Sequence, residues 1–68
     1  MLTLRQIEIV RAVMVAGSIA GAARLLNIAQ PGVSRTMKHL ETTLGIKLFV
    51  KKAGRYVPTS EARDIFTQ

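Results

Sequence analysis

Apolar residues recur every three or four positions through the first two thirds of the chain, which is the pattern of helices with one buried face. In residues 4–16 these positions are Leu4, Ile7, Val10, Val13 and Met14. Gly17 is suited to end a helix and Ser18 to cap the start of another, which is predicted over 19–26. That second segment, IAGAARLL, is rich in small residues, so Ala22 and Ala23 are expected at a close helix crossing.

A third helix is predicted over about 30–43, after a corner at Asn27, a residue type that tolerates positive φ. Its apolar positions fall on one face and are Val33, Met37, Leu40 and Leu44. The opposite face is small and basic, with Pro31, Arg35, Lys38 and Thr42 at its centre and Ser34 and His39 on its flanks. Gly45 is expected to end this helix, whose two faces therefore differ in character.

The pattern changes from helix to strand after Gly45. The segment IKLFV is β-branched and aromatic, and Leu48 and Phe49 are its expected core residues. A basic loop, KKAGR, separates it from YVP, a short second strand that Pro58 restricts to an edge or an end. These residues predict a two-stranded hairpin with a charged tip.

A last helix is predicted over 60–68, capped by Thr59. Ala62, Ile65 and Phe66 form an apolar stripe that stops where the sequence stops, with little of the chain left to cover it. We therefore expect two parts: residues 1–58 as the folded domain, and residues 59–68 as the truncated start of a linker helix.

Length and composition limit the fold to one small domain. A chain of 68 residues buries only about 60% of its unfolded surface, and it has no disulfide to strengthen it because there are no cysteines. The longest uncharged run, residues 12–23, is too short to cross a bilayer, and the N-terminus lacks the basic-then-apolar order of a signal peptide. These features predict a cytoplasmic protein with no membrane partner.

The positive charge is concentrated in the middle of the chain. The net charge of +6 equals that of residues 24–55 alone, which hold seven basic residues and one acidic residue, Glu41. The seven are Arg24, Arg35, Lys38, Lys47, Lys51, Lys52 and Arg55. Charge gathered around the third helix and the hairpin indicates a polyanionic partner.

Two helices joined by a short corner and followed by a basic hairpin are typical of a winged helix-turn-helix. The fold class predicted is therefore mainly α, a three-helix bundle with a two-stranded β-wing. This fold explains the poor helix formers that begin the third helix, since that end would enter the major groove. Pro31 costs little in a first turn, Gln30 can pair with adenine, and Arg35 can pair with guanine.

Three segments, LRQIEIVRAV, GSIAGAARLLNIAQPGVSRTMKHLETTLGIKLF and PTSEA, resemble the N-terminal DNA-binding domain of LysR-type transcriptional regulators. The joined motif A-A-x-x-L-x-I-x-Q-P-x-V-S-x-x-M-x-x-L-E-x-x-L-G-x-x-L-F carries this resemblance, which covers residues 4–62. It implies sequence-specific binding of double-stranded DNA by a bacterial regulator. It also implies a homodimer through the linker helix, a higher oligomer of the full-length protein, and a small-molecule effector bound by a C-terminal domain beyond this sequence.

The same resemblance implies the residues of the site. Base contacts are expected from Gln30, Pro31, Ser34 and Arg35. Phosphate or wing contacts are expected from Ser18, Lys38, His39, Thr42, Lys51, Lys52 and Arg55. Either Lys52 or Arg55 is expected in the minor groove. The sequence departs from the family pattern at Ala29, where Ser or Thr usually caps the recognition helix, and in the wing, where arginine usually leads the loop.

The residues alone leave two other functions open. A small basic protein-interaction module would use the same exposed helix faces. An RNA-binding protein would need aromatic stacking platforms, for which only Phe49, Tyr56 and Phe66 are available. An enzyme is disfavoured, because there are no paired carboxylates, no nucleophile with a base, no metal cluster and no phosphate loop, and no cofactor is expected for this domain.

Overall fold

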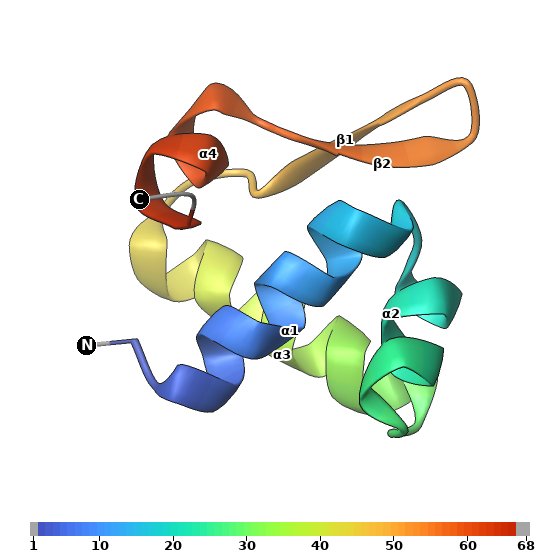
Figure 1. The fold of residues 1–68 in the computed structure, drawn as a ribbon. Helices are drawn as coiled ribbons and strands as arrows, with labels where there is room; N and C mark the ends of the chain where they lie inside the picture. Colours follow the sequence, from blue (N-terminus) through green and yellow to red (C-terminus); the bar gives the residue numbers. More distant parts are fainter. Residues whose placement is uncertain (1, 67–68) are drawn as a thin grey trace.

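The computed structural model describes residues 2–66, which form four helices and one two-stranded sheet (Figure 1). The elements are helices α1 (Leu4–Ala16), α2 (Ile19–Leu26) and α3 (Gln30–Leu44), strands β1 (Phe49–Lys52) and β2 (Arg55–Pro58), and helix α4 (Ser60–Phe66). This is the mainly α winged helix-turn-helix that the sequence predicts. Residues 67 and 68, which the prediction includes in the last helix, lie outside the described residues.

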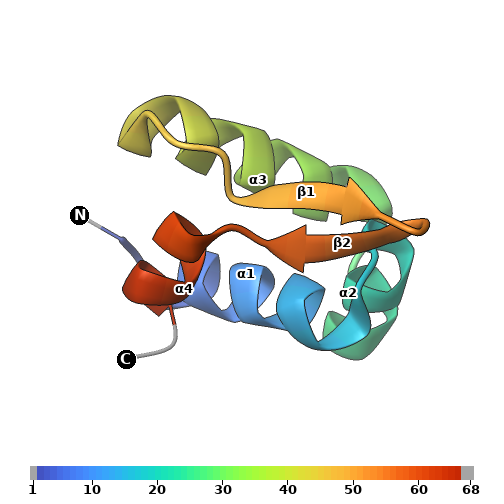
Figure 2. The same cartoon turned by 90° about the horizontal axis from the view of Figure 1, so that it is seen from above.

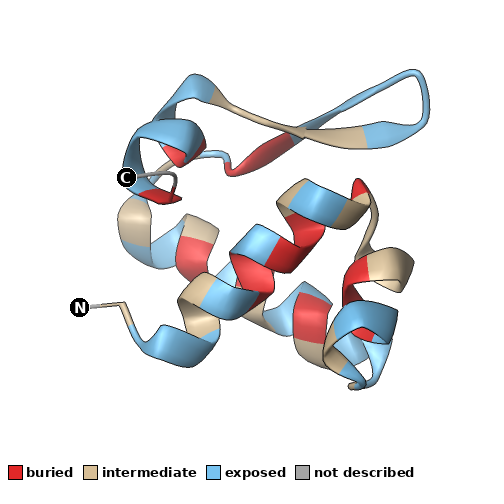
Figure 3. Ribbon diagram, viewed as in Figure 1, coloured by how far each residue is buried: buried red, intermediate tan, exposed pale blue. Residues whose placement is uncertain are grey.

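Helix α1 lies at the centre of the molecule, with α2 and α3 packed against it (Figure 1). Seen from above, the hairpin covers the space between α1 and α3 (Figure 2). Buried positions on every helix face this centre (Figure 3). The largest side chains with under 2% of their surface exposed are Phe66, Leu40, Leu48, Val10, Val13 and Val33. The helices and the base of the hairpin therefore share one core.

The turn between α1 and α2 is built by the two residues predicted for it. Gly17 adopts a left-handed conformation with φ of 73° and ends α1. Ser18 begins α2, where its Oγ accepts a hydrogen bond from the N–H of Gly21 at 2.9 Å. Ala22 and Ala23 are 0% and 4% exposed. Their small side chains let α1 and α2 pack closely, as the sequence predicts.

Helix α3 follows a corner at Asn27, which has a positive φ of 57°. The buried residues of this helix are Val33, Met37 and Leu40. Leu44 is only partly buried, and it extends the helix one residue beyond the predicted end before Gly45 stops it with φ of 69°. Ala29 stands at the N-cap and makes no side-chain hydrogen bond, so α3 begins without the usual cap.

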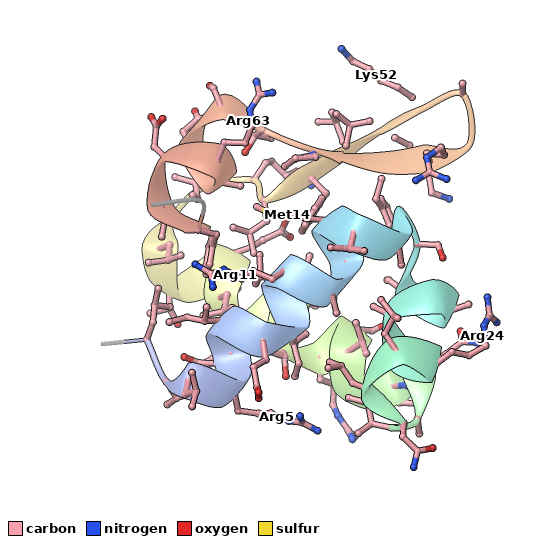
Figure 4. All side chains as sticks on the ribbon, in the orientation of Figure 1. Arg5, Arg11, Met14, Arg24, Lys52 and Arg63 are labelled. Carbon is pink, nitrogen blue, oxygen red and sulfur yellow. The ribbon has the colours of Figure 1, made fainter. Side chains whose placement is uncertain are left out.

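Three residues on the predicted apolar face of α1 lie outside the innermost core, and one of them, Ile7, is partly buried. Leu4 is 74% exposed because it begins the helix, at the edge of the bundle. Met14 is partly buried on the side of α1 that faces the hairpin (Figure 4). The core-facing side of α1 is completed by Ile9, Val10, Ala12 and Val13.

The first strand begins later than the sequence predicts. Segment 46–50 is strand-like, but β1 starts only at Phe49. The N–H of Leu48 donates to Glu41 Oε2 at 2.9 Å, and its C=O accepts from the N–H of Thr59 at 3.0 Å. The backbone before β1 is therefore bonded to α3 and to the start of α4, and not to a neighbouring strand.

The turn of the hairpin is shorter than the predicted five-residue loop. Lys52 pairs with Arg55 in the register, so Ala53 and Gly54 alone form the turn. Both turn residues have positive φ, 51° and 78°, as a type I′ two-residue hairpin turn requires. Lys51, Lys52 and Arg55 consequently lie on strands, where the ladder determines their positions.

Helix α4 packs onto the domain, so the prediction of an uncovered apolar stripe is wrong. Thr59 caps the helix as predicted, with its Oγ1 accepting from the N–H of Ala62 at 3.1 Å. Ala62 and Phe66 are 0% and 1% exposed, and only Ile65, at 39%, remains open. Arg11 Nε donates to the C=O of Phe66 at 3.0 Å and ties α4 to α1. The core of the domain itself covers this stripe.

Substituting Ala29→Ser should raise the free energy of unfolding by about 0.5–2 kcal/mol, because a hydroxyl at the N-cap can also accept from the N–H of Gly32, which donates to the C=O of Ala29 at 3.0 Å. Thermal unfolding of the two proteins measures the change. Ala29→Thr and Ala29→Val are a matched pair that differs only in oxygen against methyl, and threonine should be the more stable. No difference within this pair would contradict the capping argument.

Substituting Glu41→Leu should lower the free energy of unfolding by about 1–3 kcal/mol, because the part-buried N–H of Leu48 would lose its acceptor. Glu41→Gln keeps an acceptor oxygen on a side chain of equal length and should cost less. Denaturant titration of the three proteins tests this order. A leucine variant as stable as the starting protein would show that the bond does not stabilise the junction before β1.

Candidate nucleic-acid interface

The outward face of α3 gathers most of the residues predicted to contact DNA. Those exposed on it are Gln30, Pro31, Ser34, Arg35, Lys38, His39 and Thr42. Their exposure follows from the helical repeat, because the residues at Val33, Met37 and Leu40 turn the opposite face into the core. The four predicted base-contacting residues all lie near the start of α3, so they form one continuous end of this face.

The chemistry of this face is cationic and hydrogen-bonding. The first turn of α3 contains no acidic residue. Glutamine, serine and arginine side chains there offer donors and acceptors that match base edges, whereas Lys38 offers a point charge. Pro31 has no N–H to satisfy and occupies the first turn, where a helix tolerates it. The start of the helix is thus small enough to approach a partner closely.

The acidic residue of the basic segment, Glu41, is bound inside the fold. Its carboxylate accepts the N–H of Leu48 at 2.9 Å, next to the wing, and the residue is only partly exposed. A carboxylate that accepts a backbone bond is held in one orientation, here toward the segment before β1. The carboxylate of Glu41 therefore stabilises the junction between α3 and β1.

A shallow groove separates α3 from the wing. It has a volume of about 270 Å³ and is lined by Ile19, Ser34, Met37, Lys38, Glu41, Lys47, Phe49 and Tyr56. Apolar side chains supply part of the lining, and Lys38 and Lys47 supply positive charge. Because α3 and the hairpin both contribute residues, the groove joins the two basic surfaces into one.

The two lysines of β1, Lys51 and Lys52, have different surroundings. Lys52 lies at the tip of the hairpin and points away from the helices (Figure 4). Lys51 lies with its Nζ 5.4 Å from the ring centre of Tyr56, a cation–π arrangement. The Tyr56 ring in turn packs 6.2 Å from that of Phe49, as expected for a side chain at the base of the wing. Of these two lysines, Lys52 is the one that extends outward.

Arg55 and Ser18 are placed differently from the other predicted contacts. Arg55 is exposed, but its Nη2 turns back toward the C=O of Ala16 at 3.5 Å. The Ser18 hydroxyl is partly exposed and its oxygen is occupied by the cap of α2. Its proton remains able to donate, because a hydroxyl both donates and accepts. The other candidates are exposed on α3 and the wing, whereas the Ser18 hydroxyl and the guanidinium group of Arg55, which projects from β2, lie at the turn between α1 and α2.

Within residues 2–66, no group of three or more His, Cys, Asp or Glu side chains is placed to hold a metal ion. In the same range, no helix has both the length and the apolar character needed to cross a membrane. The candidate site is the basic surface of α3 and the wing described above.

Sequence reasoning missed two structural roles within this surface. Glu41 holds the start of the wing, and Gly17 lies under Arg55. The first contact crosses from α3 to the segment before β1, and the second joins β2 to the turn after α1; the pattern of apolar and polar positions contains no signal for either. The single acidic position in a basic segment was the one available hint for Glu41.

Proteins of similar sequence are regulators. The chain is 45% identical over 65 residues to the HTH-type transcriptional regulator DgcR of Pseudoalteromonas sp, covering 96% of this chain and 22% of that protein. It is 46% identical over 65 residues to the transcriptional activator protein LysR of Escherichia coli, covering 96% of this chain and 21% of that protein. The chain thus spans about a fifth of the length of the curated relatives it matches.

Solved structures agree with the fold. The CbnR DNA-binding domain in complex with DNA superimposes with a TM-score of 0.87 at 30% identity, covering 97% of this chain and 76% of that chain. The BenM DNA-binding domain with benA site 1 DNA gives 0.88 at 33% identity, covering 97% and 74%. The family model for bacterial regulatory helix-turn-helix proteins of the lysR family matches residues 4–63. The chain therefore belongs to the lysR family, and these residues form its winged helix-turn-helix DNA-binding domain.

Proposed function

We propose that this domain binds duplex DNA in a sequence-specific way, with α3 in the major groove and the wing at the adjacent minor groove. The observation that carries the proposal is the exposed face of α3, which combines base-reading and cationic side chains while its opposite face is buried. A helix in the major groove needs this division, because side chains on one side must reach base edges while the other side holds the helix in place.

Base reading is assigned to the start of α3. Arg35 suits a bidentate contact to guanine and Gln30 one to adenine. The Pro31 ring can touch a thymine methyl group, and Ser34 can donate or accept. All four are exposed, and they are close enough in sequence to reach neighbouring base pairs.

Phosphate contacts are assigned to the residues around this end. Lys38, His39 and Thr42 continue the exposed face of α3, and Ser18 stands at the start of α2. Lys51 and Lys52 supply charge from the wing. Lys52 is the better candidate for the minor groove, because it extends from the tip (Figure 4). Such contacts supply affinity and register, whereas the bases supply specificity.

The two other functions fit the arrangement less well. Recognition of single-stranded RNA uses exposed aromatic faces, but Phe49 and Phe66 are 7% and 1% exposed. Tyr56 is partly buried against Phe49 and lies beneath Lys51. A protein-interaction module would not require a base-reading set at the start of α3. The solved relatives bound to DNA add support for a DNA-binding role.

For the whole protein we propose a cytoplasmic, non-enzymatic transcriptional regulator with a further domain that binds a small-molecule effector. This chain matches 22% and 21% of the two curated relatives named above, which are regulators. A similar solved protein, OxyR of Corynebacterium glutamicum, is described as H2O2-bound, and this chain covers 20% of it at 26% identity. We further propose that residues 59–68 begin a linker helix that pairs two subunits, with higher oligomers of the full-length protein.

The proposed function predicts that binding is steeply salt-dependent and that Arg35→Ala reduces discrimination between a selected duplex and random duplex DNA. Each phosphate contact should add about −0.9 to the slope of log affinity against log salt. Loss of a bidentate base contact should reduce discrimination by about 1–3 kcal/mol. Titrations of duplexes selected from a random pool measure both quantities over a range of salt concentrations.

Two charge-matched controls accompany this titration. Arg5→Ala removes a charge from α1, where Arg5 pairs with Glu8 at 3.5 Å, and it should leave discrimination unchanged. Lys52→Ala should weaken selected and random duplexes by similar factors. A salt slope near zero would refute DNA binding. Equal weakening of both duplexes by Arg35→Ala would refute only its assignment to base reading.

The burial of α4 predicts that the 68-residue chain is monomeric in solution, because Ala62 and Phe66 are already covered by their own domain. A chain carrying roughly 20 further residues of linker should dimerise, since an isolated helix needs about 12–15 residues to be stable. Sedimentation equilibrium of both lengths tests this. A 68-residue chain that is dimeric at nanomolar concentration, or a longer chain that stays monomeric, would contradict the proposed linker.

A further inference from the structure

Two contacts attach strand β2 to the turn between α1 and α2. The backbone N–H of Tyr56 donates to the C=O of Gly17 at 3.0 Å. Beside it, Arg55 Nη2 donates to the C=O of Ala16 at 3.5 Å. Both acceptors lie at the C-terminal end of α1, where carbonyl groups carry partial negative charge and attract a cation. One edge of the wing is therefore held against the helix-turn-helix.

The guanidinium group of Arg55 lies against Gly17, where any side chain would occupy the same space. Its φ of 73° favours glycine, and it is buried although it lies in a turn. A Cβ on Gly17 would lie 2.5 Å from Arg55 Cζ and 3.0 Å from Nε, and the three nearest atoms to this position all belong to Arg55. The guanidinium plane thus covers the glycine, and a side chain at position 17 would displace it.

The contact between Arg55 and the end of α1 also affects Lys52, which faces Arg55 across the hairpin. The two residues are paired directly across the hairpin, next to the turn. Like charges at such a pair repel each other. With the Arg55 side chain drawn to the end of α1, its charge lies near helix carbonyls while Lys52 extends outward (Figure 4). The two charged groups therefore lie apart, one at the end of α1 and the other extending outward.

We propose that Arg55 is a positioning residue, which clamps the wing to the turn at Gly17 so that Lys52 meets DNA at a defined distance from α3. A two-stranded hairpin is marginally stable alone, so its position depends on such attachments. The inference rests on the proposed DNA-binding function and deepens it. It assigns the minor-groove contact to Lys52 and gives Arg55 a role within the protein.

A double-mutant cycle separates positioning from direct contact. Dissociation constants for a selected duplex are measured for the starting protein, Arg55→Ala, Lys52→Ala and the double variant. Lys52→Ala should weaken binding by about tenfold in the starting protein, and by much less when Arg55 is already alanine. The salt slope of the double variant should equal that of Arg55→Ala. Arg5→Ala controls for the loss of one charge.

Independent DNA contacts would give a different result. The two costs would then multiply, and each substitution would reduce the salt slope by about 0.9. That outcome would overturn the positioning role while leaving DNA binding intact. If the starting protein bound no duplex DNA at all, the proposed function would fail instead.

Hydrogen exchange of the free protein provides a test without DNA. Arg55→Ala should speed exchange of the Tyr56 amide, which is bonded to Gly17, relative to the core amides of α1 and α3. Lys52→Ala should leave this exchange unchanged. An unaltered Tyr56 amide in Arg55→Ala would overturn the clamp. A uniform increase at all amides would also overturn it, because it would show only a general loss of stability.

Discussion

The rotation of α3 about its own axis decides which side chains this domain presents, and buried contacts with α1 and α2 determine that rotation. Val10 and Val13 of α1, Ala22 of α2 and Val33 of α3 are all 0% exposed. A small domain has few such contacts, so each one has a large share in defining the packing. Turning α3 by one residue would expose Val33 and bury a polar neighbour, at a cost the core cannot offset.

The same constraint shapes the wing. A hairpin of two four-residue strands has too little apolar surface to hold its own position. Here its base is inserted into the core through Leu48 and Phe49, 0% and 7% exposed. Backbone bonds to Glu41 and Gly17 then fix its two sides. These attachments fix the width of the groove between α3 and the wing. The basic residues on its two sides form one surface with the exposed face of α3.

The excess positive charge of this domain lies where it does little to destabilise the fold. Basic residues outnumber acidic ones by ten to four, which would destabilise a compact chain if all charges shared one region. The excess lies on an exposed helix face and a projecting wing, where water screens it. Glu41, the acidic residue amid them, bonds to the backbone of Leu48 and stabilises the junction between these two elements.

The sequence by itself determined the helices, most of the residues that end or begin them and the basic face, because these depend on residues within a few positions of each other. Gly17, Ser18, Asn27 and Gly45 each end or begin a helix as predicted. Periodicity also identified Val33, Met37 and Leu40 as the buried side of α3.

Only the tertiary structure decided how distant segments meet. Residues 46–48 have strand-like composition, yet their backbone groups bond to α3 and to Thr59, so β1 starts later. The sequence predicts that the apolar stripe at Ala62 and Phe66 is uncovered, but α1 and the hairpin pack against it. Arg55 and Lys52 are equivalent as basic wing residues in sequence. Their difference arises because one reaches the carbonyl end of α1 across 39 positions, and local pattern carries no information about such a contact.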